Sequence, residues 1–231
     1  MKTNILYEDS HLFVIHKPAG LAVQSARVGQ MDCEGELKNY LARQGERPYI
    51  GLVHRLDQPV EGVLAVARTK EAATKLNKQL AAGTLNKKYL AVVHLEKEVE
   101  ETDSFTDYLM KDGQIAKIVS SNIIKEEKNG KDVKEARLNY QILQRKSNLA
   151  LVDIVIETGR FHQIRCQMAH HGMPLIGDAK YGSSTSQEIS LKEGIRQVAL
   201  CANRIAFKHP VTGKELSFEV KPENKAFANF L

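Results

Sequence analysis

The sequence has little cysteine and no long apolar segment. Its three cysteines, Cys33, Cys166 and Cys201, are an odd number and lack the spacing of metal ligands. They indicate neither a disulfide framework nor a zinc site, and we expect reduced thiols. No segment approaches the roughly 20 apolar residues that span a bilayer, and the first ten residues turn acidic before a signal-peptide core could form. We therefore expect a cytoplasmic protein that does not contact a membrane.

Signatures of metal and phosphoryl-transfer enzymes are also missing. The histidines form neither a His-Glu-x-x-His nor a His-x-His pattern, and the neighbours His170 and His171 are expected on different sides of a helix. His54-Arg55-Leu56-Asp57 has the order of a kinase catalytic loop, but no glycine-rich phosphate loop precedes it and no Asp-Phe-Gly follows. These absences predict that the chain holds no metal.

The chain does contain ample apolar sequence and a mild excess of positive charge. It has 231 residues, 42% of them hydrophobic, which is enough for a large buried core. Lysine and arginine number 33 against 28 acidic residues, and the pI near 9.0 suits a polyanionic partner. Acidic residues crowd positions 96–107, whereas basic residues gather at Arg55, Lys87-Lys88, 160–165 and 196–208. If these basic stretches converge, they form a positive cleft that suits phosphate groups.

The apolar patterns predict an α+β fold of antiparallel hairpins with a few helices. Strands are expected at residues 5–7, 12–16, 63–67, 88–94, 115–124, 138–143, 151–156, 198–207 and 216–220. Helices are expected at 37–41, from a Thr69 cap to Gly83, and at 163–171, whereas 183–188 is expected to be flexible. Asn129-Gly130 predicts a hairpin turn. No repeat or domain boundary is evident, so we predict one catalytic domain over residues 1–231.

Asp57 is placed where a carboxylate should lose part of its water. It lies between Leu56 and a turn that contains Pro59 and Gly62, directly before the apolar run 63–67. A carboxylate at the mouth of a buried strand needs compensation, or its pKa will rise. That cost suggests a functional role, although aspartate also favours such turns as an ordinary cap.

A phenol and two arginines could complete a site with this carboxylate. Tyr89 begins a strand among lysines, and Arg160 and Arg165 stand at a strand-to-helix corner. An arginine paired with Asp57 would lower the carboxyl pKa by about 1–3 units and keep it ionised. Taken singly, such a tyrosine is more often a core residue, and such arginines are as often surface or structural ion pairs.

Six segments in a fixed order give the chain a resemblance to a known family. His54-Arg55-Leu56-Asp57, followed by Gly62 and an apolar strand, resembles the signature of the RluA-type pseudouridine synthases. Lys87-Lys88-Tyr89-Leu90-Ala91-Val92-Val93 is similar to their second motif, and Gly159-Arg160-Phe161-His162-Gln163-Ile164-Arg165 to their third. Further landmarks are Leu6-Tyr7-Glu8-Asp9 with Lys17-Pro18-Ala19-Gly20, Gly177-Asp178 with Tyr181-Gly182, and His209-Pro210 with Thr212-Gly213. The resemblance covers nearly the whole chain.

The resemblance implies a fold and a set of roles. The implied fold is a pseudouridine synthase fold, a mixed and mainly antiparallel sheet in two halves flanked by helices, with the active cleft between them. Asp57 is implied to be the essential nucleophile, Tyr89 to lie against the target uracil, and Arg165 to pair with Asp57. The candidates for RNA contact are His54, Arg55, Lys87, Arg160, His162 and Gln163. The sequence leaves open whether Asp57 attacks C1′, attacks the ring or acts as a base on the sugar.

We therefore predict an RNA pseudouridine synthase, an isomerase that modifies uridines in structured ribosomal or transfer RNA. The isomerisation conserves atoms, so neither a cofactor nor a metal is expected. Arg55 could fill the space that the target base vacates when it flips out. No ribosomal-protein-like S4 domain is expected before Ile5, so the catalytic domain would recognise RNA alone, and a monomer is favoured.

The sequence departs from the family pattern at a few positions. Val60-Glu61 replaces the Thr-Ser pair that usually follows the aspartate, and a carboxylate four residues from Asp57 would raise the pKa of Asp57 unless a lysine or arginine offsets it. Gln167 and Cys201 stand where histidines are expected. The main alternative is therefore a catalytically impaired RNA-binding protein of the same fold. A metal-dependent RNA hydrolase is a second alternative.

Overall fold

The computed structural model describes residues 1–25, 29–120 and 133–231, which form two compact units. The first unit comprises Met1–Lys88 and Cys201–Glu223, and the second comprises Tyr89–Leu200 and Asn224–Leu231. The chain leaves the first unit within strand β5 (Asn86–His94) and returns to it within strand β10 (Leu200–Lys208). A single catalytic domain over residues 1–231 stays a prediction.

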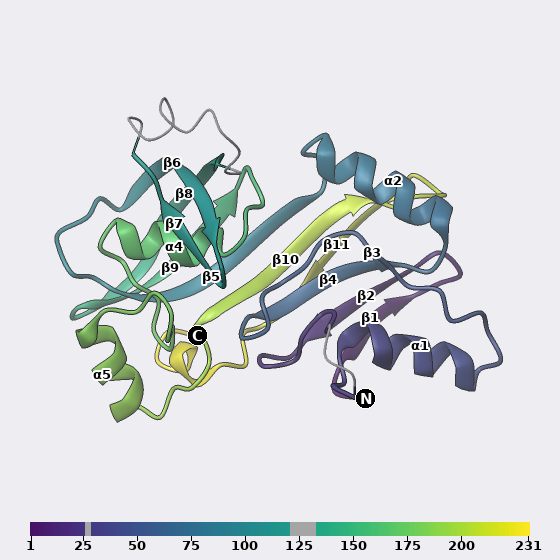
Figure 1. The fold of residues 1–231 in the computed structure, drawn as a ribbon, viewed down its shortest axis with the longest axis horizontal. Coiled ribbons are helices and arrows are strands. Elements are labelled where there is room, and N and C mark those ends of the chain that lie inside the picture. The colour runs from purple at the N-terminus through teal and green to yellow at the C-terminus, as the bar shows by residue number, and fades with distance from the viewer. Residues whose placement is uncertain (26–28, 121–132) are drawn as a thin grey trace. The chain divides into compact units, whose positions relative to one another are not determined.

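The first unit is built on strands in the order β1-β2-β4-β10 (Figure 1). The predicted opening hairpin is confirmed as β1 (Asn4–Glu8) and β2 (Leu12–Lys17), and β4 (Glu61–Ala67) follows the turn that carries Asp57. The short β3 (Gly51–Leu52) pairs with β4, and β11 (Glu215–Glu219) pairs with β10. β4 and β10 run parallel, whereas the other pairings with a defined register in this unit are antiparallel. Every residue of β4 is buried, as its unbroken apolar run predicts.

Gly62 explains how β4 can lie so close to β10. It pairs with Ala202 and has a φ of 134°, in a region that side chains rarely adopt. A Cβ atom at this position would lie 2.5 Å from both the backbone nitrogen and the backbone oxygen of Ala202. Glycine is therefore required directly after the Asp57 turn.

Two helices complete the first unit. α2 (Lys70–Ala81) begins after Thr69, whose hydroxyl accepts the Ala72 N–H at 3.1 Å, and it packs on β3 and β4. Gly83 follows the helix with a φ of 69°, so both predicted ends are confirmed. α1 (Cys33–Arg43) is longer than the predicted 37–41, because Asp32 caps it by accepting the Gly35 N–H at 2.7 Å.

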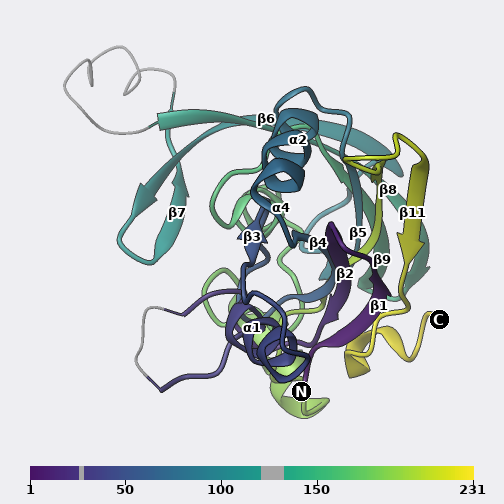
Figure 2. The same cartoon turned by 90° about the vertical axis from the view of Figure 1, so that its right-hand side faces the viewer.

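The second unit has the strand order β5-β9-β8-β6-β7 (Figure 2). β8 (Val133–Lys146) pairs antiparallel with both β6 (Thr102–Asp112) and β9 (Leu149–Ile156), and β6 pairs antiparallel with β7 (Ile115–Ile118). β6 was not predicted, because its acidic residues mask the alternation of buried Phe105 and Leu109 with exposed positions. The expected strand at 115–124 begins as β7, but its positions 121–124 and the Asn129-Gly130 turn lie outside the described residues.

In the second unit, one predicted helix is confirmed and one helix forms where the sequence predicted a flexible segment. α4 (Gln163–His170) is confirmed, and Gly172 follows it with a φ of 82°. α5 (Ser184–Lys192) replaces the flexible segment predicted at 183–188, because Ser183 caps it by accepting the Ser186 N–H at 3.2 Å. The short 3-10 helix η1 (Lys225–Phe227) follows β11 in the chain.

The described residues thus confirm the predicted class, α+β with a mixed and mainly antiparallel sheet. None of the helices among the described residues has the length and apolar character needed to cross a lipid bilayer.

Candidate active site

Within the first unit, a buried lysine holds the turn that carries Asp57. The Lys17 ammonium donates to the carbonyl oxygens of Pro18 at 3.0 Å, Leu21 at 2.7 Å and Gln58 at 3.1 Å. The same Gln58 carbonyl accepts the Gly20 N–H at 2.8 Å. Lys17 therefore links Gln58, the residue after Asp57, to the turn that follows β2. Each of its three N–H groups donates one hydrogen bond.

Lys17 is also a counter-charge for the half-buried Asp57. Burial lowers the pKa of Lys17 to about 8, and the nearby carboxylates of Asp57 and Glu61 oppose this shift. Because its pKa lies above 7, the ammonium form predominates at neutral pH and attracts the Asp57 carboxylate. Sequence reasoning treated Lys17 only as a family landmark. The available signal was a lysine that directly follows the strand-like run Leu-Phe-Val-Ile-His, and every residue of the strand Leu-Phe-Val-Ile-His-Lys is buried.

Val60 and Glu61, which replace the Thr-Ser pair of the family pattern, are both buried. The exposed fraction is 2% for Val60 and 1% for Glu61. The Glu61 carboxylate accepts the Glu223 N–H at 3.0 Å, and its charge acts on Lys17. Lys17 is thus the cation that offsets this second carboxylate. The two residues contribute to the core and to the electrostatics of the turn, whereas neither offers a surface to a ligand.

His54 is a buried neutral residue. Its Nε2 accepts the Ala65 N–H at 3.2 Å, so the ring proton is on Nδ1. Burial and the nearby charge of Lys87 lower the pKa of His54 to about 3. This environment favours a role in holding the loop against β4 and disfavours the predicted RNA contact.

We expect His54 to make the protein acid-sensitive. Its folded-state pKa of about 3 lies below the ordinary 6.5, so the unfolded chain takes up the proton first as pH falls. Stability is therefore complete above about pH 6.5 and declines progressively toward pH 3, by about 2 kcal/mol at pH 5. Urea unfolding at pH 7 and pH 5 should show that His54→Gln, which keeps a hydrogen-bond acceptor but does not titrate, loses less stability than the native chain. Equal losses would contradict this expectation.

In the second unit, Arg165 makes a buried two-pronged ion pair with Asp178. Nε donates to Oδ2 and Nη2 donates to Oδ1, both at 2.7 Å, and the side chains are 3% and 0% exposed. Asp178 also accepts the backbone N–H groups of Lys180 at 3.0 Å and Tyr181 at 3.2 Å. The fork geometry fixes the plane of the guanidinium. Sequence reasoning missed this role for Asp178, although it noted Gly177-Asp178 as a landmark.

The Tyr181 ring connects this ion pair to His162. The Arg165 guanidinium carbon lies 5.2 Å from the ring centroid, within cation–π range. The Tyr181 oxygen accepts the Ala116 N–H at 2.6 Å and lies 2.8 Å from His162 Nδ1. Burial raises the pKa of Tyr181 to about 12, so the phenol keeps its proton beside His162 Nδ1. The hydrogen bond between the two side chains fixes the buried His162, which has a left-handed φ of 53° at the start of α4.

The buried side chain of Gln163 also makes its hydrogen bonds within the protein. Its side-chain oxygen accepts from the Thr158 hydroxyl at 2.8 Å and from the Arg160 N–H at 3.0 Å, and its amide donates to the Arg137 carbonyl at 3.0 Å. Gln163 therefore shapes the corner that precedes α4. Its burial, like that of His54 and His162, disfavours direct contact with RNA.

The remaining candidates for RNA contact are more accessible. Arg55 is exposed, and Lys87 and Arg160 are half-buried. Arg160 Nε donates to the Glu135 carbonyl at 2.8 Å, which leaves its terminal nitrogens for other acceptors, and burial lowers the pKa of Lys87. Tyr89 is 5% exposed and is the first residue of the second unit. The predicted meeting of Asp57 with Tyr89 and Arg165 joins residues of two units, and it stays a prediction.

The sequence matches known proteins over most of its length. The family model described as RNA pseudouridylate synthase matches residues 11–170. The ribosomal large subunit pseudouridine synthase D of Xylella fastidiosa is 34% identical over 90% of this chain and 62% of the relative. The synthase D of Pseudomonas aeruginosa is 35% identical over 95% of this chain and 68% of the relative. The ribosomal large subunit pseudouridine synthase C of Buchnera aphidicola is 31% identical over 98% of this chain and 69% of the relative. The chain thus spans 62–69% of the length of these relatives.

Solved structures share the fold. Human RNA pseudouridylate synthase domain containing 4 superposes with a TM-score of 0.74 and 23% identity over 95% of this chain and 89% of the human chain. Human RNA pseudouridylate synthase domain containing 1 gives a TM-score of 0.73 and 19% identity over 95% of this chain and 83% of the human chain. The predicted pseudouridine synthase fold is therefore confirmed. Together with the match over residues 11–170, this places the chain in the RNA pseudouridylate synthase family.

Proposed function

We propose that this protein is an RNA pseudouridine synthase, with Asp57, Tyr89 and Arg165 as its catalytic residues. The observation that carries the proposal is the family match over residues 11–170, which includes all three motif segments. The surroundings of Asp57 support it, because a half-buried carboxylate is held in a fixed turn beside a buried ammonium. A carboxylate so placed is partly shielded from water and has a cation beside it.

The reaction exchanges one bond to the sugar for another. The bond between N1 of uracil and C1′ breaks, the bond between C5 and C1′ forms, C5 loses its proton to solvent, and N1 gains a proton. Attack by Asp57 on C1′, attack on the ring and removal of a sugar proton all begin from the carboxylate form. Lys17 would stabilise that form from the first unit. Arg165, oriented by Asp178, would stabilise it from the second.

Tyr89 would contribute an aromatic face and a phenolic oxygen. The ring can stack on the uracil while it is detached, and the phenol can assist the removal of the C5 proton. Its position directly after Lys87-Lys88 puts it beside two cations that attract the RNA backbone. Tyr89→Phe would keep the aromatic face and remove the phenol, which separates these two contributions.

RNA is the proposed partner, and large-subunit ribosomal RNA is the first substrate to test because the relatives carry that substrate in their names. The exposed Arg55 would occupy the space left by the flipped base, while Lys87 and Arg160 would contact phosphates. His54, His162 and Gln163 would position these groups from the interior. Activity without a cofactor, a cytoplasmic location and a monomeric state belong to the same proposal.

A catalytically impaired RNA-binding protein is the second candidate, and Val60-Glu61 is the observation that suggested it. Both residues are buried, and Glu61 is held by the Glu223 N–H and the charge of Lys17. Because Val60 and Glu61 face the core, their departure from the family pattern changes the residues that hold the Asp57 turn. It leaves the Asp57 carboxylate itself unchanged. Their burial favours the enzyme over the binder.

Release of tritium from RNA labelled at C5 of uridine tests the proposal. Transcripts of large-subunit ribosomal RNA are incubated with the protein in parallel with and without a chelator, and label in water is measured together with strand integrity. We expect release of tritium from intact RNA. Binding without release would establish the binder, and strand cleavage that the chelator suppresses would establish a metal-dependent hydrolase. A parallel incubation with transfer RNA distinguishes the two substrate classes.

A further inference from the structure

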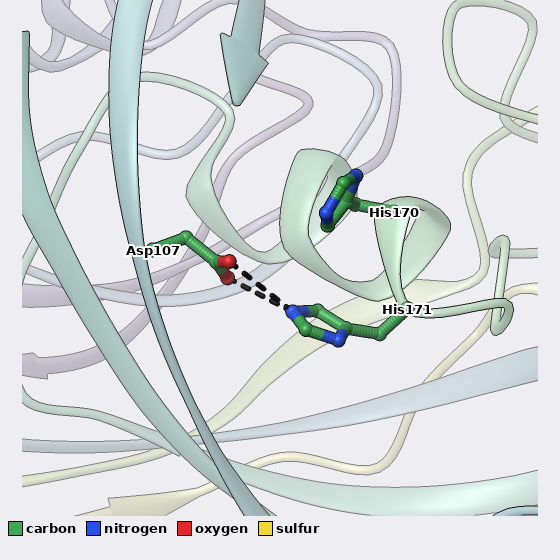
Figure 3. Close-up of side chains that lie close together, drawn as sticks. All are labelled: Asp107, His170 and His171. Carbon is green, nitrogen blue, oxygen red and sulfur yellow. Dashed lines mark hydrogen bonds and ion pairs between the residues drawn. The ribbon is translucent and has the colours of Figure 1, made fainter. Parts of the chain in front are cut away.

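Asp107, His170 and His171 form a cluster of metal-ligating side chains in the second unit. Asp107 lies on β6, His170 is the last residue of α4, and His171 caps the end of that helix. One donor atom from each side chain lies within 4.8 Å of the others. Figure 3 shows His171 directed toward the carboxylate of Asp107, with His170 on the adjoining helical turn. Adjacent histidines can share this site because the backbone leaves the helix at His171, so the expectation that they face different sides is wrong.

Two of the three ligands are already oriented by their neighbours. His171 Nε2 lies 3.0 Å from Asp107 Oδ2. The His171 ring stacks on Phe105 with centroids 3.7 Å apart and planes inclined by 10°. Gln167, one turn earlier on α4, donates from its amide to the same Asp107 oxygen at 2.7 Å. Outer partners of this kind are what fix metal-ligating imidazoles and carboxylates in known sites.

The surroundings favour a cation. The carboxyl end of α4 carries partial negative charge, which adds to the charge of Asp107. The adjoining pocket, of about 330 Å³, is lined by His171 and Phe105 and by the charged residues Lys97, Glu98, Glu100 and Asp103. Acidic groups outnumber the single lysine there, so the local potential attracts a divalent ion.

We propose that Asp107, His170 and His171 bind a divalent transition-metal ion of the zinc class. Two imidazoles and one carboxylate are a ligand set that suits Zn²⁺, with water in the fourth position. Zn²⁺ bonds of about 2.0–2.2 Å place tetrahedral ligands roughly 3.3 Å apart, close to the separation that His171 and Asp107 already have. His170 is exposed, so its ring can rotate to complete the site without disturbing the core. The cluster contains none of Asp57, Tyr89 and Arg165, and the proposal does not depend on the proposed reaction.

Calorimetric titration of the tag-free full chain with Zn²⁺, after treatment with chelator, tests the proposal. We expect one equivalent to bind and the melting temperature to rise. His170→Ala and Asp107→Asn should each weaken binding at least ~10-fold. Co²⁺ in place of Zn²⁺ should give the visible absorption of a tetrahedral site, which His170→Ala should abolish.

Asp103→Asn is the matched control, because it removes a carboxylate from the same strand and the same pocket without removing a ligand. It should leave the Co²⁺ spectrum unchanged and weaken the affinity far less than the loss of a ligand does. His170 is an exposed side chain, so a folding defect is not expected in His170→Ala, and circular dichroism verifies this. Absence of binding, or binding that His170→Ala and Asp107→Asn leave unchanged, would overturn the proposal.

Discussion

Asp57→Asn is expected to abolish tritium release from C5-labelled RNA, by at least ~10³-fold, while the chain stays folded and still binds RNA. Asparagine has nearly the same shape but cannot provide the negative charge from which each of the three routes starts. The turn should persist, because the change leaves two of its backbone contacts in place: the Val60 N–H donates to the Asp57 carbonyl at 3.0 Å, and the Lys17 ammonium donates to the Gln58 carbonyl at 3.1 Å. Rates measured under single-turnover conditions report on chemistry rather than on product release.

Asp153→Asn provides the comparison for this substitution. Asp153 is a half-buried aspartate of β9 that lies outside the predicted site, so the same change of side chain should leave the rate unaltered. Electrophoretic mobility of the labelled RNA verifies that Asp57→Asn still binds. Full activity of Asp57→Asn would remove Asp57 from the mechanism, and a parallel loss in Asp153→Asn would show that the assay responds to charge alone.

The sequence predicted the elements whose patterns are local. A continuous apolar run after the Asp57 turn predicted β4, and a capping threonine with a terminal glycine predicted α2. β6 and α5 escaped prediction for the same physical reason. Their polar and acidic residues hide a small number of buried positions, such as Phe105 and Ser186, that become evident only when β8 or the neighbouring loops cover them.

The candidate site was predicted by its motifs, but its supporting contacts were not. Asp57 and Arg165 were singled out from the sequence, whereas the partners that hold them were recorded only as landmarks. Lys17 is separated from Gln58 by 41 positions, and Asp178 follows Arg165 by 13. Such pairings depend on how strands and loops return on one another, which periodicity does not encode. The sequence also could not indicate that His54, His162 and Gln163 would face the interior, because each is polar and lies within three positions of an exposed or half-buried arginine, Arg55 or Arg160.

Arg165→Met is expected to destabilise the protein by about 3–5 kcal/mol, because it leaves the Asp178 carboxylate buried without its counter-charge. The two backbone N–H groups that Asp178 accepts would remain, but they do not replace a two-pronged guanidinium. Urea unfolding measures the change. Arg137→Met is the matched comparison, since Arg137 pairs with Glu135 and Glu157 at the surface, and it should produce no comparable loss.

A double variant separates the structural role of Arg165 from its catalytic role. Arg165→Met with Asp178→Asn removes both charges and keeps a side-chain oxygen that can accept the Lys180 and Tyr181 N–H groups, so it should recover most of the stability that Arg165→Met loses. If Arg165 also stabilises the carboxylate of Asp57, the double variant will be folded and RNA-binding yet deficient in tritium release. Recovery of both stability and activity would restrict Arg165 to supporting the second unit. A stable Arg165→Met variant would show that Asp178 is compensated by some other group. Because the catalytic and structural hypotheses predict opposite activities for one well-folded chain, this variant tests the proposed pairing of Arg165 with Asp57 independently of the fold.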